Sequence, residues 1–241
     1  MPYTYEYPHP AVTVDIIIFA LHEEELKVLL IQRKRDPFKE HWAIPGGFVE
    51  INEGLEEAAR RELYEETGVE KVFLEQLYTF GEPKRDPRER IISVAYYSLV
   101  RLDQHNVRAD SDALNAAWFS VYDLPHLAFD HDKILDMAIR RLQGKVMYAP
   151  VIFEMLPPIF EIHELQRVYE IILRQKFDAA SFRRRILGTG ILTPVDPRHG
   201  GDGMRKKSLY RFDPEKYARM TQKGFTFEIK LQEPRKNRKG K

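Results

Sequence analysis

One segment, residues 47–69, constrains the fold of this chain more than any other, and it reads GFVEINEGLEEAARRELYEETGV. Its middle part, Leu55 to Thr67, predicts a helix. Gly68 follows directly, and a glycine at this place can adopt the left-handed backbone that ends many helices. At about 100° per residue, four side chains of the helix form one apolar face. They are Leu55, Ala58, Ala59 and Leu63.

Three acids of the same helix have positions that an ordinary surface helix does not explain. Glu62 and Glu66 fall inside the apolar face, one turn apart, and Glu65 lies at its edge. A carboxylate that points into a protein core is costly unless it is paired or bound to a metal. Mg²⁺ and Mn²⁺ prefer hard oxygen ligands, and Mg²⁺ commonly lies between one or two carboxylates and the phosphates of a substrate. Gly46 and Gly47, just upstream, allow the backbone to approach such an ion closely.

The alternative interpretation is an amphipathic helix whose acids form salt bridges, with Arg60 or Arg61 as partners. This alternative explains acids on an exposed face, but it does not explain acids on the buried face. The spacing therefore favours a divalent metal held against a diphosphate.

The segment resembles the Nudix box and matches it at every specified position. The matching pattern is Gly47, five residues, Glu53, seven residues, Arg61-Glu62-Leu63, one residue, Glu65-Glu66, one residue and Gly68-Val69. The resemblance implies a mixed sheet between helices, with the box as strand, loop, helix and loop. That family cleaves X-linked nucleoside diphosphates with Mg²⁺ and water, where the metal polarises the diphosphate and lowers the pKa of a bound water.

The resemblance also implies a role for each residue of the box. Glu62, Glu65 and Glu66 would be metal ligands, and Gly47 would offer its carbonyl oxygen. Glu53 and Arg61 would brace the loop and the catalytic helix. These five side chains are therefore the expected catalytic residues, with Mg²⁺ or Mn²⁺ as the cofactor.

Composition excludes several classes of protein. The 241 residues include no cysteine, so disulfides and cysteine-based zinc sites are excluded. The apolar run Val12–Ala20 is too short for a membrane span. Residues 1–10 lack the basic start and apolar core of a signal peptide. We therefore expect a cytoplasmic protein that does not enter a membrane.

The near-neutral net charge of +1 hides a split along the chain. Residues 1–150 hold 26 acidic and 18 basic side chains, whereas residues 151–241 hold 11 acidic and 20 basic ones. This asymmetry suggests two domains with different partners, and the basic half is a candidate for nucleic-acid binding. A merely solvated basic surface is the alternative. Prolines at 150, 157 and 158 place the boundary, so we expect domains at 1–148 and 149–233 and a disordered basic tail at 234–241.

The first half alternates between strand and helix signals in the order that a Nudix fold requires. The expected strands are Val12–Phe19, Lys27–Ile31, Val72–Tyr78, Ile91–Val100 and Ala117–Ser120. A helix over Lys133–Gln143 would close this domain and end at Gly144. This order fits the N-terminal α/β/α sandwich with a mixed sheet that the resemblance implies, and we expect an α+β fold class for the chain.

A basic loop, GEPKRDPRER at residues 81–90, joins two of these strands. Arginines near a metal–diphosphate site can clamp phosphates or a carboxylate. The loop also resembles one in ADP-ribose-type Nudix proteins and related regulators, although a solvated charged loop is the alternative. The expected ligand-binding residues are Gly46, Arg85, Arg88 and Arg90.

The second half contains two helical patterns, His163–Leu173 and Ala179–Leu187, and Asp178 is a suitable N-cap for the latter. In the second helix Ala179, Phe182 and Ile186 point to one side. The opposite side carries Ser181, Arg184 and Arg185, with Arg183 between the two.

A hairpin with a basic tip follows these helices. Its strands are Ile191–Val195 and Ser208–Phe212, and its tip contains Arg205, Lys206 and Lys207. Helix, turn, helix and hairpin is the order of a winged helix. Ser181, Arg184 and Arg185 would then face base edges in the major groove. Arg183 and the three basic residues of the tip would hold phosphates.

Residues 153–212 resemble the C-terminal domain of Nudix-related transcriptional regulators, including the NAD-metabolism and arabinose-utilisation branches. The resemblance implies a homodimer on a palindromic DNA operator, with the Nudix pocket sensing a nucleotide-sugar such as ADP-ribose or a sugar such as arabinose. Two positions depart from the pattern. His163 stands where a threonine cap is frequent, and Ser181 replaces a frequent asparagine.

The sequence leaves open whether hydrolysis is retained. The box is intact, but Asn115 occupies a position where active relatives often have a glutamate, and asparagine cannot act as a base. Asp110, Asp112, Glu82 or Glu89 could substitute for it. Three hypotheses follow: a ligand-sensing DNA-binding regulator, a Mg²⁺-dependent pyrophosphatase and, more weakly supported, an RNA-directed Nudix protein.

Overall fold

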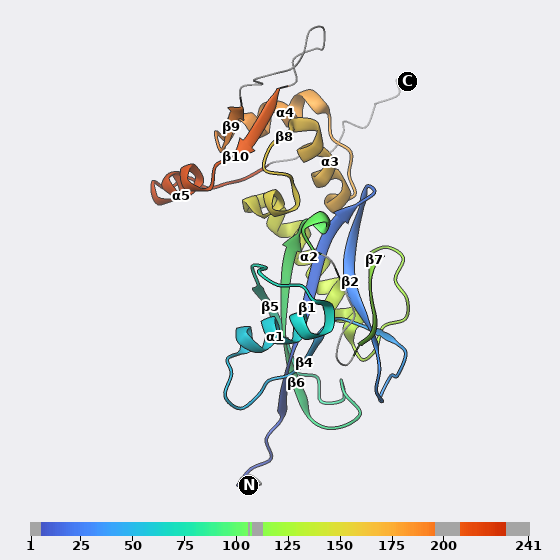
Figure 1. The fold of residues 1–241 in the computed structure, drawn as a ribbon. Coiled ribbons are helices and arrows are strands. Elements are labelled where there is room, and N and C mark those ends of the chain that lie inside the picture. The colour runs from blue at the N-terminus through green and yellow to red at the C-terminus, as the bar shows by residue number, and fades with distance from the viewer. Residues whose placement is uncertain (1–5, 106, 108–112, 196–207, 230–241) are drawn as a thin grey trace, which may run out of the picture. The chain divides into compact units, whose positions relative to one another are not determined.

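The computed structural model describes residues 6–105, 107, 113–195 and 208–229. The chain forms two compact units, Met1–Arg141 and Leu142–Lys241, and Figure 1 labels their elements. In the described parts of the chain, no helix combines the length and the apolar character that a membrane span needs.

The described part of the first unit contains a seven-stranded mixed sheet. Its main path runs β3–β2–β1–β6–β5, while β4 pairs with β1 and β7 pairs with β2. Strands β1 and β6 are parallel, and the other neighbours are antiparallel. The strands are β1 (Ala11–His22), β2 (Glu25–Arg33), β3 (Trp42–Ala43), β4 (Gly46–Phe48), β5 (Glu75–Phe80), β6 (Ile91–Val100) and β7 (Ala113–Ser120), and a short helix, η1 (Leu102–Gln104), follows β6.

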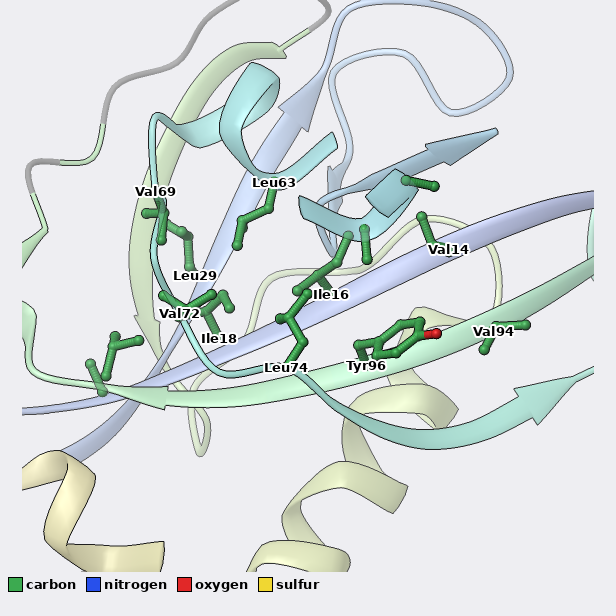
Figure 2. Packing of buried hydrophobic residues seen from close by; sticks show 14 residues of the cluster. Val14, Ile16, Ile18, Leu29, Leu63, Val69, Val72, Leu74, Val94 and Tyr96 are labelled. Atoms are coloured by element: carbon green, nitrogen blue, oxygen red, sulfur yellow. The ribbon is translucent and has the colours of Figure 1, made fainter. Parts of the chain in front are cut away.

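Strand β1 is central because both of its faces are apolar. Figure 2 shows one face packed with residues of helix α1 (Leu55–Thr67), and every second residue of β1 points there. These residues are Val14, Ile16 and Ile18. Ile17 and Phe19, which point to the other face, are equally buried. A strand covered on both faces needs a continuous apolar run, and Asp15 is the charged exception.

Helix α1 ends as the sequence predicts. Gly68 has a φ of 71°, in the left-handed region, and its N–H donates to the Tyr64 carbonyl at 2.8 Å. Ala58, Ala59 and Leu63 are buried as expected. The expected burial of Leu55 is wrong, because this side chain is 38% exposed. Leu55 is the first helical residue, and helical side chains lean towards the N-terminus, so it points past the end of the helix.

Helix α2 (His131–Tyr148) continues through Gly144, so the predicted end at that residue is wrong. Leu142 and Val146, one turn apart on either side of the glycine, are both fully buried. A glycine inside a helix costs about 1 kcal/mol relative to alanine. Burial of the two apolar side chains contributes about 1.5–3 kcal/mol each, which outweighs that cost.

Two strand predictions need correction in extent. Strand β7 begins at Ala113 rather than Ala117, because its first half pairs with the end of β2, where Asn115 lies opposite Gln32. Strand β5 begins at Glu75 rather than Val72. Val72 is nevertheless buried in the core beneath α1, which explains its apolar character.

The second unit has the helices and hairpin of a winged helix, so the predicted fold class is confirmed. A three-stranded sheet, in the order β8–β10–β9, accompanies the helices. The elements are η2 (Pro150–Met155), β8 (Phe160–Glu161), α3 (Ile162–Leu173), α4 (Ala179–Gly188), β9 (Leu192–Val195), β10 (Leu209–Phe212) and α5 (Pro214–Gln222). The buried face of α3 consists of Ile162, Leu165, Val168, Tyr169 and Ile172.

Helix α3 is capped by acids rather than by His163. Glu161 is the N-cap residue, and its backbone N–H donates to the Glu164 carboxylate at 2.7 Å. The hairpin tip with Arg205, Lys206 and Lys207 lies outside the described residues, as does the tail 234–241.

Candidate functional site

The turn from β4 to α1 brings two glycines against the acids of the helix. The Gly46 N–H donates to Glu66 Oε2 at 2.8 Å. A Cβ atom built on Gly47 would lie 2.4 Å from the carboxylate of Glu62, and one on Gly46 would lie 2.1 Å from the Val14 carbonyl. Neither position can accept a larger residue without moving backbone or a packed carboxylate. The two glycines therefore set how closely the acids approach the turn.

Arg61 holds this arrangement together from the solvent side. Its guanidinium donates to both carboxylate oxygens of Glu53, at 2.6 and 3.0 Å, and to the Phe48 carbonyl at 3.0 Å. It also donates to Glu62 at 2.8 Å and to Glu65 at 3.2 Å. These bonds raise the pKa of Arg61, with Glu53 as the largest cause. One side chain thus ties the loop before α1 to two acids of the helix.

Glu62 and Glu66 form a partly desolvated acidic pair. Glu66 is 7% exposed. Burial raises the pKa of Glu66 to about 8, and the charge of Glu62 adds to the rise. Burial also raises the pKa of Glu62. Glu65 differs, because 45% of its side chain is exposed. The described residues contain no group of three acids or histidines already arranged around a cation position.

These acids line a cavity of about 410 Å³ in the first unit. Its walls carry charges of both signs. The acids are Asp15, Asp36, Glu50, Glu62, Glu65, Glu66 and Asp86. The bases are Arg33, Lys34, Arg35, Arg61, Arg85 and Arg88. Two aromatic rings, Phe48 and Phe129, complete the apolar part of the lining.

Arg85 and its partners form a buried charged network at the cavity wall. The guanidinium makes a bidentate contact with Asp130 at 2.7 and 3.2 Å, and lies 3.5 Å from Asp15. Asp15 also accepts a hydrogen bond from Ser93. His131 Nδ1 accepts from the Ile44 N–H at 2.9 Å, and burial lowers the pKa of this imidazole. The network joins β1 and the loop after β5 to the start of α2.

Arg88 is fixed between an acid and two rings. It donates to Asp86 at 2.7, 3.0 and 3.3 Å. Its guanidinium carbon lies 5.3 Å from the centre of the Phe48 ring and 5.6 Å from that of Phe129. Arg90 points elsewhere and donates to the Gly81 carbonyl at 2.7 Å, and it does not line the cavity.

In the second unit, helix α4 begins at a side-chain N-cap and carries three consecutive arginines. The Asp178 side chain accepts from the Ser181 N–H at 2.9 Å, as predicted, and Phe182 and Ile186 are buried. Ala179, expected beside them, is exposed. Arg184 is exposed, while Ser181 and Arg185 are half-buried.

Arg183 links α4 to the hairpin. Its guanidinium donates to the Tyr210 hydroxyl of β10 at 3.0 Å and lies 5.7 Å from the centre of that ring. This contact fixes the wing against the second helix of the helix-turn-helix.

Comparison with known proteins agrees with this geometry. The profile described as NUDIX domain matches residues 9–139, and the profile described as NrtR DNA-binding winged helix domain matches residues 152–212. A relative from Acinetobacter baylyi, named "ADPR responsive transcriptional repressor NtrR", is 36% identical over 234 residues, which are 95% of this chain and 90% of the relative. The chain belongs to the NrtR family of Nudix-related transcriptional regulators.

One further comparison covers nearly the whole chain, and a second covers little more than the Nudix domain. The crystal structure of Shewanella oneidensis NrtR complexed with a 27mer DNA has a TM-score of 0.75 and 32% identity, and covers 92% of this chain and 99% of that one. An ADP-ribose pyrophosphatase of Methanocaldococcus jannaschii is 44% identical over 138 residues, which are 57% of this chain and 78% of the relative.

The structure brings together most of the residues that the sequence selected in the Nudix domain of this NrtR-family chain. Gly46, Gly47, Arg85, Arg88 and four side chains of the box line one cavity. Those four side chains are Arg61, Glu62, Glu65 and Glu66.

Other candidates lie apart from the cavity lining. Glu53 contacts the site through Arg61 and through the Glu50 N–H, which donates to its carboxylate at 2.8 Å. Asn115 is exposed on β7, and its side-chain oxygen accepts from the Ala116 N–H. Glu82 and Glu89 are exposed outside the lining. Asp110 and Asp112 lie outside the described residues.

Sequence reasoning missed Arg33, Asp86, Asp15 and His131. The sequence carried a signal for Asp15, because a lone acid in the apolar run of β1 requires a partner.

Proposed function

We propose that this regulator binds a duplex DNA operator and that ADP-ribose, bound in the cavity of the Nudix domain, changes its affinity for DNA. The observation that carries the proposal is the presence, in one chain, of an acid-and-arginine cavity and a capped helix rich in arginine. The relatives support each half, because one is named for its response to ADPR and another was crystallised with DNA.

The cavity favours a phosphorylated ligand. Its volume of about 410 Å³ lies within the usual range for small-molecule sites, about 300–1,000 Å³. Arg88 lies at the cavity wall, as expected for a residue that contacts phosphate, while Arg85 also lines the cavity but is bound to Asp130. A neutral sugar such as arabinose has no anionic group that the cations of the cavity could bind. A nucleotide-sugar diphosphate is therefore the better candidate, although Arg90 would act on it only through the loop that it stabilises.

We assign DNA contacts to α4 and the wing. Arg184, Arg185 and Ser181 would reach base edges, and Arg183, with Arg205, Lys206 and Lys207, would hold phosphates. Two copies would bind a palindromic operator, since a two-fold dimer matches the symmetry of such sites. The Nudix domain would extend over residues 1–148 and the DNA-binding domain over residues 149–233.

The test is fluorescence anisotropy on a duplex from upstream of the protein's own gene, at two salt concentrations. We expect tight binding to this duplex and weak, salt-erased binding to a scrambled one. Addition of ADP-ribose should shift the binding curve, whereas L-arabinose should leave it unchanged. Equal binding to both duplexes would contradict the regulator, and a shift by arabinose alone would contradict the ligand.

A second candidate function, hydrolysis, is favoured by the acidic pair at Glu62 and Glu66. The two carboxylates face one cavity with raised pKa values, which suits a bound divalent cation. Glu62, Glu65, Glu66 and the Gly47 carbonyl would hold Mg²⁺ or Mn²⁺. The ion would polarise a diphosphate and activate water. Arg61 would orient Glu62 and Glu65, and the Gly46 N–H would fix Glu66. The pyrophosphatase relative supports this candidate.

Glu66→Gln should lower the rate of any Mg²⁺-dependent release of AMP from ADP-ribose by about 100-fold or more if the ion is required. Glutamine keeps the shape of Glu66 and still accepts from Gly46. The pKa of Glu66, raised to about 8, already favours its neutral form at neutral pH, so the metal-free fold should be preserved. Turnover would be measured by AMP release over a magnesium titration.

The matched control is Glu56→Gln, an exposed acid of the same helix that pairs with Arg60. It should leave turnover unchanged. Undiminished turnover in Glu66→Gln would exclude this carboxylate from the hydrolytic mechanism. If the wild type shows no turnover either, the protein acts only as a sensor, and the DNA-binding proposal is unaffected.

A further inference from the structure

Arg33, the last residue of β2, lines the cavity and is held by backbone carbonyls and an aromatic ring. Its Nε donates to the Pro37 carbonyl at 3.0 Å, and one terminal nitrogen donates weakly to the Arg35 carbonyl at 3.4 Å. The guanidinium carbon lies 4.7 Å from the centre of the Phe129 ring. These contacts fix the plane of the guanidinium. None of them neutralises its charge.

Three other arginines that line the cavity each pair with a carboxylate. Arg61 pairs with Glu53, Arg85 with Asp130, and Arg88 with Asp86. Among the described residues, none places a carboxylate within ion-pairing distance of Arg33. This guanidinium therefore has hydrogen-bonding capacity and charge that the protein itself does not use.

The positive charge of Arg88 lies near that of Arg33, so an anion bound there would be stabilised by both. Arg33 and Arg88 contact the same Phe129 ring, at 4.7 and 5.6 Å. Burial, together with the charge of Arg88, lowers the pKa of Arg33. Two cations against one ring in a half-buried site are more favourable when an anion lies between or beside them.

Glu66, a buried acid of the same cavity, does not neutralise Arg33. Its buried carboxylate receives one N–H bond, from Gly46, and forms no ion pair within the described part of the chain. Glu66 and Arg33 line the same cavity but form no salt bridge with each other. The cavity thus contains a guanidinium without a counter-charge, and the buried Glu66 does not supply one. A ligand phosphate would supply that negative charge.

We propose that Arg33 is a specificity-determining residue of this cavity, whose guanidinium, backed by Phe129, binds a phosphate oxygen of the ligand directly. The inference rests on the proposed function for the nucleotide part of the ligand, but not for the anion. It implies that a phosphorylated ligand is selected over its dephosphorylated form at Arg33, independently of any metal. The phosphate could be a diphosphate or a terminal monoester, and the test distinguishes the two.

The experiment is isothermal titration calorimetry on the full chain and on Arg33→Gln. The probes are ADP-ribose, ribose 5-phosphate, inorganic pyrophosphate and adenosine, each with Mg²⁺ and with EDTA. Loss of a charge-assisted hydrogen bond should weaken ADP-ribose binding about 10- to 100-fold, both with Mg²⁺ and with EDTA. Adenosine, which has no phosphate, should bind both proteins equally. Dependence on Arg33 for pyrophosphate but not ribose 5-phosphate would assign the diphosphate, and the reverse would assign a monoester.

Two further variants separate ligand binding from structure. Lys39→Gln removes a charge from the exposed loop after Arg33, outside the cavity, and should not change any affinity. Arg33→Lys keeps the charge but not the planar fork, so it should restore ADP-ribose affinity only in part. A thermal unfolding curve of Arg33→Gln within a few degrees of wild type would show that the fold is intact.

The outcomes distinguish this inference from the proposed function. If Arg33→Gln binds ADP-ribose as tightly as the wild type, the inference is wrong, while the function stands. If the wild type binds pyrophosphate through Arg33 but ADP-ribose neither binds nor alters DNA affinity, the inference stands and the proposed ligand is wrong. If no phosphorylated probe binds the wild type, both are wrong.

Discussion

Replacement of both Arg184 and Arg185 by alanine should weaken operator binding by about 100-fold or more. Both lie on α4, whose start is fixed by the Asp178 cap and whose other face is buried through Phe182 and Ile186. A bidentate arginine–guanine pair contributes about 1–3 kcal/mol of discrimination against the wrong base. Two such losses in each half-site of a dimer would add, so specific binding should approach the non-specific level.

The measurement is anisotropy on the operator and on a scrambled duplex over a range of salt concentrations. If the two arginines read bases, affinity for the operator should fall much more than affinity for the scrambled duplex. If they contact phosphates instead, both affinities should fall together, and the salt slope should decrease by about 1 for each lost contact. Unchanged operator binding would contradict the assignment of α4 to DNA.

A matched control removes the same amount of charge elsewhere. Arg140 on α2 and Arg219 on α5 are exposed, and each pairs with an acid one turn away, Asp136 and Glu215. The variant Arg140→Ala/Arg219→Ala should bind the operator nearly as the wild type does. If it loses as much affinity as the α4 variant, net charge rather than a specific helix face determines binding.

Arg85→Ala should destabilise the protein by about 3–5 kcal/mol. The Arg85 side chain is 5% exposed and pairs with Asp130, whose side chain is 12% exposed. Its removal leaves two acids, Asp130 and Asp15, without their shared cation in a poorly solvated place. Loss of one partner of a buried ion pair is more costly than loss of the whole pair, because an uncompensated charge remains.

Urea unfolding of the variant, followed by circular dichroism, would measure this loss. Arg140→Ala breaks an exposed ion pair with Asp136 and should cost less than about 1 kcal/mol. The double variant Arg85→Met/Asp130→Leu removes both charges and should recover part of the lost stability, although Asp15 remains. A loss below about 1 kcal/mol in Arg85→Ala would mean that water reaches the network and screens it.

Helical periodicity predicted a large part of the acidic side of the cavity. The acids of α1 stand out because Glu62 and Glu66 interrupt an apolar face, and this signal lies within one helix. The Asp178 cap and the buried Phe182 and Ile186 are local in the same sense. Such features follow from neighbouring residues, so a single sequence is enough to predict them.

Which arginines of the cavity pair with acids could not be predicted from neighbouring residues. Arg85 and Arg88 looked equivalent in the basic loop, but Arg85 is committed to Asp130, 45 residues further along the chain. The sequence did not distinguish Arg33, because its surroundings form only when β2 pairs within the sheet and Phe129, from the segment before α2, packs against it. Which charges remain available for a ligand depends on pairings between distant segments. The sequence pattern contains no information of that kind.

Helix α2 determines how the halves of this chain could be exchanged with those of relatives. The residues after Arg141 belong to the second unit, where the Val146 carbonyl accepts from the Tyr169 hydroxyl at 3.1 Å and the Met147 carbonyl accepts from the Ile229 N–H at 2.9 Å. A hybrid joined after Tyr148 would supply these positions from a foreign sequence and would lose the buried Val146 side chain. A junction at Arg141 keeps them with their partners. Exchange of one domain of this chain should therefore preserve packing better at a junction within α2 than at one in the segment that follows it.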